Sequence, residues 1–226
     1  MLVSLGYPDG EEIGINAFRQ AIERISRVVS IPLSVDSLAG FGLTPKEVES
    51  SIRAVIESGA VGINIEDYDH KVKKLFPAEK QVEKLKAIKS LQNSTGISFV
   101  INARTDALRF AKGSNEEKFE EAVRRASLYR DMGVDCVYPM GLTKKVAMEN
   151  FVRALDNFPT NMMIRRGLSS FKELEEIGVA RVSFGPSASY AVMGFLKRIS
   201  KQILEERNYS LLLDGAISFE ELNSLE

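Results

Sequence analysis

Two carboxylates and one arginine follow apolar stretches of the sequence, at positions where buried strands would end. Asp36 follows "IPLSV", Glu66 follows "VGINI" and Arg104 follows "ISFVINA". Parallel sheets and barrels place their sites at the carboxyl ends of the strands, so these three side chains are candidates for one site. Carboxylate oxygens suit Mg²⁺, which takes one or two carboxylates and keeps several waters. Because the guanidinium of Arg104 can fork onto a carboxylate, the pattern predicts a site for a hard cation and an anionic ligand.

Two asparagines share strand faces with these charges, because side chains alternate along a strand. Asn64 lies on the face of Glu66, and Asn102 lies on the face of Arg104, where it is a candidate for binding the anionic ligand. Plainer roles remain open for both carboxylates. Asp36, which precedes the glycine-rich turn "GFG", also suits a turn or a helix cap. Glu66 also suits a buried salt bridge to Arg104, because an unpaired carboxylate is costly inside a protein.

Two further side chains have chemistry of their own. His70, the only histidine, lies four residues after Glu66 and is either an exposed loop residue or a ligand-binding residue at the mouth of the site. The segment that it opens, "HKVKKLFPAEK", is either a mobile lid or a solvated basic loop. Cys136, the only cysteine, lies between two valines of an apolar run, which predicts an inert core residue rather than a nucleophile.

Short β-branched runs alternate with amphipathic helical stretches, which is typical of βα units and a parallel sheet buried on both faces. The predicted strands are Ile31–Val35, Val61–Ile65, Ile97–Ala103, Val134–Tyr138, Met162–Ile164 and Ala180–Phe184. Capping boxes that begin at Thr44, Ser114 and Ser170 mark three helix starts. No linker divides the chain, so we predict one domain over residues 1–226. Within it, residues 208–226 form a C-terminal extension that carries a short capped helix at Ser218–Leu222.

Composition excludes several classes of protein. The chain has 226 residues and a net charge of −1, so its charge does not favour nucleic acid or an anionic membrane as a partner. One cysteine excludes a disulfide framework and any multi-cysteine metal site. The sequence contains neither a long uncharged apolar stretch nor a signal-peptide pattern, so we expect a cytoplasmic protein.

Five motifs resemble those of a known superfamily. "SLGYPDG", "PLSVDSLAGFG", "GINIEDYDH", "VINARTDA" and "GVARVSFGP" stand in the order and spacing of the isocitrate lyase/phosphoenolpyruvate mutase superfamily, whose members include 2-methylisocitrate lyases and carboxyphosphonoenolpyruvate phosphonomutases. The resemblance implies an α/β fold of the (β/α)8 TIM-barrel type, in homodimers or homotetramers that exchange their last helix. It also implies a lyase that uses Mg²⁺, or Mn²⁺ in its place. Such an enzyme makes or breaks a C–C or P–C bond in a small 2-oxo or 2-hydroxy acid, or a phosphonate relative, through a metal-stabilised enolate.

The superfamily's site residues can be carried over at matching positions. Asp36 matches the direct metal ligand, and Glu66 matches a catalytic carboxylate that holds the ion through water. Arg104 matches the catalytic arginine that grips the substrate carboxylate. Asp9, in "GYPD", matches a further catalytic aspartate near the metal-bound waters.

Three departures from the pattern point to an alternative function. Leu38 stands where the superfamily usually has a second acid, and the loop after Glu66 lacks the cysteine of isocitrate and methylisocitrate lyases. The first strand, first helix and second strand have no counterpart, so we expect an N-terminally incomplete barrel with strands three to eight. Its unpaired strand edges would favour an oligomer. We therefore expect little cleavage of isocitrate or methylisocitrate, and turnover of oxaloacetate or phosphonopyruvate instead. The alternative is a catalytically degenerate member that acts as a binding or assembly subunit.

Overall fold

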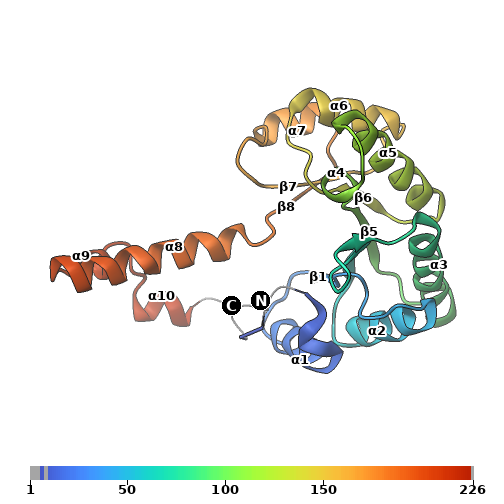
Figure 1. Cartoon of the computed structure of the whole chain (residues 1–226). Coiled ribbons are helices and arrows are strands. Elements are labelled where there is room, and N and C mark those ends of the chain that lie inside the picture. The colour runs from blue at the N-terminus through green and yellow to red at the C-terminus, as the bar shows by residue number, and fades with distance from the viewer. Residues whose placement is uncertain (1–5, 8–9, 225–226) are drawn as a thin grey trace. The chain divides into compact units, whose positions relative to one another are not determined.

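Strands and helices alternate along most of the chain in the computed structural model, which describes residues 6–7 and 10–224 (Figure 1). The strands are β1 (Ser34–Asp36), β2 (Gly62–Glu66), β3 (Tyr68–Asp69), β4 (Lys74–Leu75), β5 (Val100–Thr105), β6 (Cys136–Pro139), β7 (Asn161–Met163) and β8 (Arg181–Ser183). The helices are α1 (Gly14–Ser26), α2 (Pro45–Glu57), α3 (Ala78–Thr95), α4 (Ala107–Phe110), α5 (Asn115–Asp131), α6 (Lys145–Ala154), α7 (Phe171–Ile177), α8 (Ser187–Lys201), α9 (Ser210–Leu213) and α10 (Phe219–Asn223). A 3₁₀-helix, η2 (Glu11–Ile13), precedes α1, and a π-helical segment (Gln202–Glu206) follows α8.

Four strands form one parallel sheet in the order β1-β2-β5-β6. A parallel bridge from Val137 of β6 to Thr160 leads on to β7, and β7 and β8 form a two-stranded sheet. Within the part of the chain that the structure describes, the strand pairing does not return from β8 to β1, so the barrel is not closed. All six predicted strands are present, which confirms the predicted parallel α/β arrangement.

The structure adds detail that the sequence pattern did not predict. β1 begins at Ser34 rather than at Ile31, because Pro32 has no N–H to donate to a strand ladder. The basic segment after Glu66 contains a short antiparallel hairpin of β3 and β4, in which Tyr68 pairs with Leu75. These strands are two residues long, which is too short for an alternation pattern to reveal.

The predicted helix starts are confirmed by their caps. The side chains of Thr44, Ser114 and Ser170 each accept a hydrogen bond from the backbone N–H of a glutamate three residues later. The carboxylate of that glutamate in turn accepts a hydrogen bond from the backbone N–H of the capping residue. Ser218 caps α10 by accepting from the Glu221 N–H at 3.0 Å. Each cap satisfies N–H groups that a helix leaves without a partner in its first turn. The caps therefore set where the chain leaves each loop.

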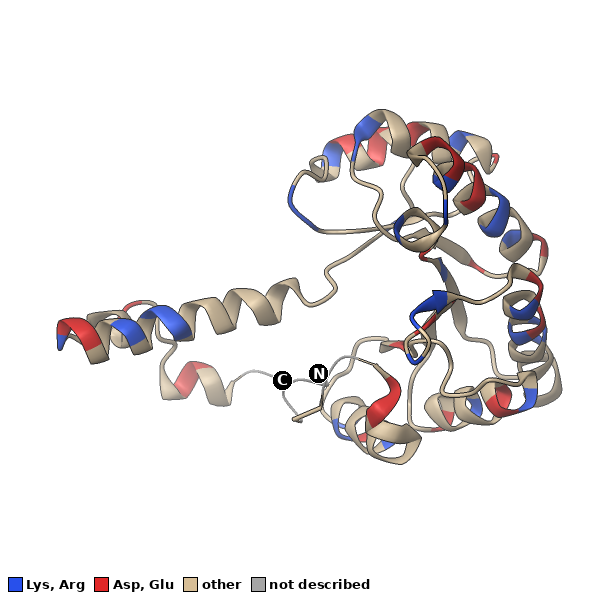
Figure 2. Cartoon of the chain, in the orientation of Figure 1, with Lys and Arg blue, Asp and Glu red and all other residues tan. Residues whose placement is uncertain are grey.

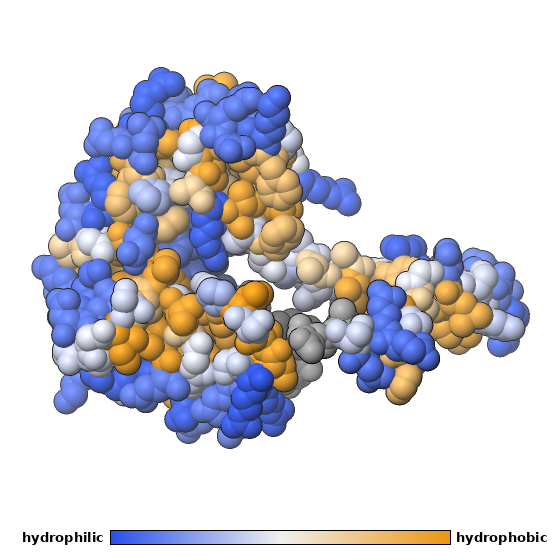
Figure 3. All heavy atoms as spheres, turned by 180° about the vertical axis from the view of Figure 1, so that it is seen from behind, coloured by the Kyte–Doolittle hydropathy of each residue, from blue (hydrophilic) through white to orange (hydrophobic). Residues whose placement is uncertain are grey.

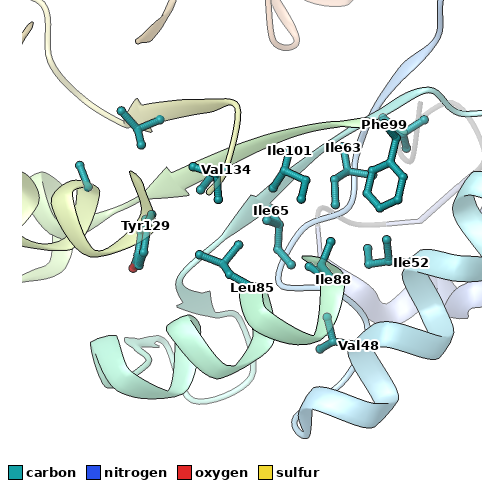
Figure 4. Packing of buried hydrophobic residues seen from close by; sticks show 14 of the residues in the cluster. Val48, Ile52, Ile63, Ile65, Leu85, Ile88, Phe99, Ile101, Tyr129 and Val134 are labelled. Carbon is teal, nitrogen blue, oxygen red and sulfur yellow. The ribbon is translucent and has the colours of Figure 1, made fainter. Parts of the chain in front are cut away.

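The core lies between the parallel sheet and the helices that cover it (Figure 4). Ile63 and Ile65 of β2 are fully buried and pack with Ile52 of α2 and with Leu85 and Ile88 of α3. Asn64 lies between these isoleucines and Glu66 follows them, so both point to the opposite face of the sheet, because successive side chains of a strand alternate. The apolar face of the sheet thus holds the helices, and the other face is left for polar side chains. The helices that cover the sheet carry both basic and acidic residues (Figure 2).

The chain divides into two compact units. The larger comprises Met1–Met162 and Gly167–Val182, and the smaller comprises Met163–Arg166 and Ser183–Glu226. Several apolar side chains of α8 in the smaller unit are at least half exposed, including Tyr190, Val192 and Met193. Hydrophobic residues contribute to the surface of this unit in Figure 3. Within the described residues, none of the helices combines the length and apolar character needed to cross a membrane. The assignment of residues 1–226 to one domain, with residues 208–226 as an extension, stays a prediction.

Candidate active site

A row of hydrogen-bonded side chains crosses the polar face of the sheet. Asn64 of β2 donates to Asp36 of β1 at 3.0 Å, and Asn102 of β5 donates to Asn64 at 2.9 Å. The three residues are direct partners in the strand register, which is why their side chains meet at one level. Asp36 is exposed, and within the described residues no hydrogen bond reaches its Oδ2 atom. The buried Oδ1 of Asn102 likewise has no hydrogen-bond partner there. The row therefore ends in two oxygen atoms without a hydrogen-bond partner among the described residues, and the one on Asp36 belongs to an exposed side chain.

A chain of ion pairs lies at the carboxyl ends of β2 and β5. Glu66 and Arg104 are opposite each other in the register, and the Glu66 Oε2 atom lies 2.7 Å from the Arg104 Nη1 atom. Arg104 also holds Asp106, with its Nε atom 2.7 Å from Oδ2 and its Nη2 atom 3.0 Å from Oδ1. Arg109 of α4 reaches the same Oδ1 atom at 3.1 Å. Glu66 and Asp106 are buried, whereas 44% of the Arg109 side chain is exposed.

Burial and neighbouring charges shift the pKa values of this chain. Burial raises the pKa of Glu66, the hydrogen bond from His70 and the charge of Arg104 oppose the rise, and the charge of Asp36 adds to it. Burial alone would lower the pKa of Arg104, but Glu66 and Asp106 raise it, so this side chain stays positively charged. The charge of Asp36 therefore acts on Glu66 from a distance, without a hydrogen bond between the two carboxylates.

Aromatic side chains stand beside these charges. His70 forms a hydrogen bond with the Oε1 atom of Glu66, and its ring meets the edge of Tyr68 at a centroid distance of 5.1 Å. Tyr68 stacks on Phe110 of α4 at 4.1 Å, and the Arg109 guanidinium lies 4.7 Å from the centre of the Phe110 ring. The hairpin after β2 and the helix after β5 are thereby joined next to Glu66.

A second buried carboxylate, Asp67, organises the same strand ends from the other face of β2. It accepts hydrogen bonds from the Thr105 hydroxyl, the Asp106 N–H and the Tyr129 hydroxyl, each at 2.8 Å. Arg125 of α5 donates to it at 3.0 Å. These contacts fix the end of β2 to the end of β5. Sequence reasoning missed Asp67, although an acid directly after Glu66 has to point to the opposite face of the strand.

The structure places the predicted site residues as follows. Asp36 and Asn102 belong to the row of amides, and Glu66, Arg104 and His70 contact one another. Asp9 lies outside the described residues. In the described part of the chain, no three His, Cys, Asp or Glu side chains converge into a ready-made metal cluster.

Two other residues are relevant to the chemistry. Leu38 is 5% exposed, so its side chain offers no oxygen to a ligand and is packed away from solvent. Cys136 is buried in β6, and burial raises the pKa of its thiol to about 12. A thiol that stays protonated at neutral pH is a poor nucleophile, which agrees with the core role predicted for Cys136.

Comparisons with known proteins bear on the identity of this site. The phosphoenolpyruvate phosphomutase family model matches residues 2–204. The chain is 32% identical to a 2-methylisocitrate lyase of Escherichia coli K12 over 162 residues, which cover 67% of this chain and 51% of that enzyme. It is 27% identical to an oxaloacetate decarboxylase of Bradyrhizobium sp. ORS 278 over 183 residues, which cover 78% of this chain and 58% of that enzyme. The chain thus spans about half the length of the methylisocitrate lyase.

Solved structures give the same result for the fold. A protein of Burkholderia cenocepacia J2315 matches 98% of this chain with a TM-score of 0.88 and 26% identity, and the match covers 78% of that protein. This likeness confirms the barrel-type α/β fold that the sequence motifs implied. The chain belongs to the phosphoenolpyruvate phosphomutase family, and so to the isocitrate lyase/phosphoenolpyruvate mutase superfamily.

Proposed function

We propose that the chain is a Mg²⁺-dependent enzyme that forms or breaks a C–C bond, or a P–C bond, in a small 2-oxo or 2-hydroxy carboxylic acid. The observation that carries the proposal is the placement of Asp36, Glu66 and Arg104 at the carboxyl ends of three adjacent parallel strands. The lyases among its relatives support the reaction class. The substrate, the metal and the activity itself belong to this proposal.

The oxygen donors fit a hard divalent cation. Asp36 offers an exposed carboxylate oxygen, and Glu66 offers a buried carboxylate whose second partner is the imidazole of His70. Asp36 would hold Mg²⁺ or Mn²⁺ directly and Glu66 would hold it through water, which agrees with the small number of carboxylates that Mg²⁺ needs. Bound there, the ion supplies positive charge beside the substrate oxygen on which negative charge develops.

Arg104 would orient the substrate through its carboxylate. Its hydrogen bonds with Asp106 use two of the five N–H groups of a guanidinium, and its Nη1 atom lies 2.7 Å from Glu66, so further N–H groups remain for a substrate oxygen. Asp106 locks the plane of the guanidinium before the substrate arrives, which lowers the entropic cost of binding. Arg109, held by the same Asp106 and partly exposed, extends the positive surface. Asn102 would accept a hydrogen bond from a substrate hydroxyl or a bound water at its unpaired Oδ1 atom.

The substrate choice follows from the hairpin after β2. His70 contacts Glu66 and would help to close the site around the substrate, but the hairpin contains no cysteine to act as a proton donor. We therefore propose oxaloacetate or phosphonopyruvate as substrates rather than isocitrate or methylisocitrate. We expect His70→Ala to retain oxaloacetate turnover. Loss of that turnover would show that His70 is essential, which this proposal does not expect.

A catalytically degenerate member that acts as a binding or assembly subunit is the second candidate. The observation in its favour is Leu38, because an apolar side chain stands in the turn after Asp36 where an acid would offer an oxygen donor. A protein that binds the metal and a substrate analogue without turnover would support this reading.

The test is turnover of oxaloacetate and phosphonopyruvate with Mg²⁺, compared between the wild type, Asp36→Asn and Asp156→Asn. Asp156 is the control, because 90% of its side chain is exposed and its ion-pair partner is Arg130, far from the strand ends in sequence. The proposal expects Asp36→Asn to lose about a hundredfold or more in rate, as when a preorganised charge contact is removed, and Asp156→Asn to keep its rate. Equal rates in all three proteins would overturn it.

Three predictions accompany this function. Asp9 would stand near the metal-bound waters, as the motif "GYPD" implies. We expect a cytoplasmic protein without nucleic-acid or membrane partners. We also expect a homodimer or homotetramer, which the exposed apolar residues of α8 support. Light scattering that finds a stable soluble monomer would contradict the oligomer.

A further inference from the structure

The loop between β1 and α2 has a backbone that needs outside support. Leu38, Gly40 and Phe41 have φ angles of +52°, +98° and +54°, in the left-handed region. Glycine adopts this region readily, but leucine and phenylalanine adopt it only when surrounding contacts hold them there. The loop begins directly after Asp36, so its conformation sets the direction of that carboxylate.

Two oppositely charged side chains hold this loop by its backbone. The ammonium group of Lys84, on α3, donates to the carbonyl oxygen of Ala39 at 3.1 Å. The carboxylate of Glu11, on η2, accepts from the N–H of Phe41 at 2.7 Å. Hydrogen bonds that involve a charged group are roughly twice as strong as neutral ones. The two contacts lie two residues apart, on either side of Gly40.

Lys84 is an unusual residue for such a position, because its side chain is fully buried. Its ammonium group lies 3.7 Å from the centre of the Phe76 ring. Burial lowers the pKa of Lys84 to about 8, and the attraction of Glu11 opposes that shift. A buried charge costs stability, and an apolar residue of similar size is often at least as stable in its place. What the buried ammonium group contributes to the structure is its hydrogen bond to the carbonyl oxygen of Ala39.

We infer that Lys84 and Glu11 are positioning residues, which hold the loop of residues 37–43 and thereby aim Asp36. The role of Asp36 as a metal ligand rests on the proposed function, but the rigidity of the loop does not. A residue that served only the core would stabilise the whole chain evenly. A positioning residue affects this loop more than the rest.

The test is amide hydrogen exchange of residues 37–43 in Lys84→Met and in the control Lys80→Met. Lys80 lies one turn earlier on the same helix and also faces the Phe76 ring, at 5.1 Å. We expect the loop amides of Lys84→Met to exchange about tenfold faster or more, which is the scale of one lost charged hydrogen bond. We expect its thermal midpoint to stay the same or to rise, because the buried charge is gone. Loop exchange equal to that of Lys80→Met would overturn the inference.

Glu11 provides a second test that leaves the core intact. Glu11→Ala should speed exchange in the same loop, and Glu11→Gln should restore most of the protection, since its amide oxygen still accepts from Phe41. Unchanged exchange in Glu11→Ala would overturn the inference for this residue. Mn²⁺ titration of the same variants separates the two proposals. Absence of Mn²⁺ binding by the wild type contradicts the proposed function, whereas the exchange rates of the loop decide the inference in either case.

Discussion

Glu66 and Asp67 are consecutive buried carboxylates with very different surroundings. Asp67 accepts four hydrogen bonds, including one from the buried Arg125 and one from the backbone of Asp106. Glu66 has His70 and Arg104 as partners and lies close enough to Asp36 to be repelled by its charge. A carboxylate whose lone pairs are all used by the protein serves the fold. One that is left with spare capacity and a repulsive neighbour suits a ligand that brings positive charge.

The largest effect should come from Asp67→Asn. This change removes the fully buried partner of Arg125 and leaves it the partly exposed Glu121, and breaking a buried ion pair costs about 3–5 kcal/mol in the free energy of unfolding. Urea denaturation measures the loss. Tyr129→Phe is the graded control, because it removes only one of the four donors and should cost about 1–3 kcal/mol. A loss in Asp67→Asn no larger than that in Tyr129→Phe would contradict the structural role of Asp67.

Glu66→Gln should give the opposite pattern. We expect oxaloacetate turnover to fall by about a hundredfold or more, while the free energy of unfolding changes far less than in Asp67→Asn. The reason is that Arg104 keeps Asp106 as a partner, and the cost of burying the Glu66 charge is removed. The same urea denaturation, with a rate assay beside it, makes the comparison. If Glu66→Gln is as destabilised as Asp67→Asn, the contrast between the two carboxylates is wrong.

Leu38→Asp should sharpen the contrast by giving the site another acid. Aspartate tolerates the left-handed backbone at this position better than leucine does, so the change relieves local strain. Without metal the added charge lies near Asp36 and should lower stability. With metal it should tighten Mn²⁺ binding by about tenfold, which corresponds to one modest charge interaction beside the exposed Asp36. Mn²⁺ titration with and without the substitution measures this, and unchanged affinity would show that Leu38 lies away from the ion.

Lys84 should also make the free energy of unfolding depend on pH. Its pKa is lowered from 10.5 to about 8 because burial disfavours the ammonium form. Between these values the unfolded chain holds the proton and the folded chain releases it, so the free energy of unfolding rises with pH across this window. Below about pH 8 both states are protonated and the cost of the buried charge is constant. Glu11 and Asp69 attract the ammonium group, and Lys80 repels it.

Urea denaturation of the wild type and Lys84→Met from pH 7 to 10 isolates this contribution. Any stability advantage of Lys84→Met should shrink as the pH rises. An advantage that stays constant to pH 10 would show that Lys84 does not lose its proton in the folded state within this range.

Local sequence signals predicted the framework of the fold. Capping residues such as Thr44 and Ser114 marked helix starts, because the hydrogen bonds that they make are within three residues of them. Alternation along the strands correctly placed Asn64 beside Glu66 and Asn102 beside Arg104. Two-residue strands such as Tyr68–Asp69 are too short to carry such a signal.

The contacts between distant residues were beyond reach of the pattern. Lys84 lies in a helix rich in lysine and glutamate, yet it is fully buried against a loop 45 positions earlier. Asp67 accepts a hydrogen bond from Tyr129, 62 positions away, and neither the residue types nor their spacing predicts that pair. Such contacts depend on how helices α3 and α5 pack on the sheet, which is a property of the whole fold.

The most direct test of the metal site is a Mn²⁺ titration of the wild type, Asp36→Asn and Asp156→Asn, followed by electron paramagnetic resonance and competed with Mg²⁺. We predict one Mn²⁺ ion per chain, displaced by Mg²⁺ in the wild type and in Asp156→Asn. We predict at least tenfold weaker binding in Asp36→Asn, as expected for the loss of a direct ligand charge. Absence of specific binding by the wild type, or binding that Asp36→Asn leaves unchanged, would contradict it.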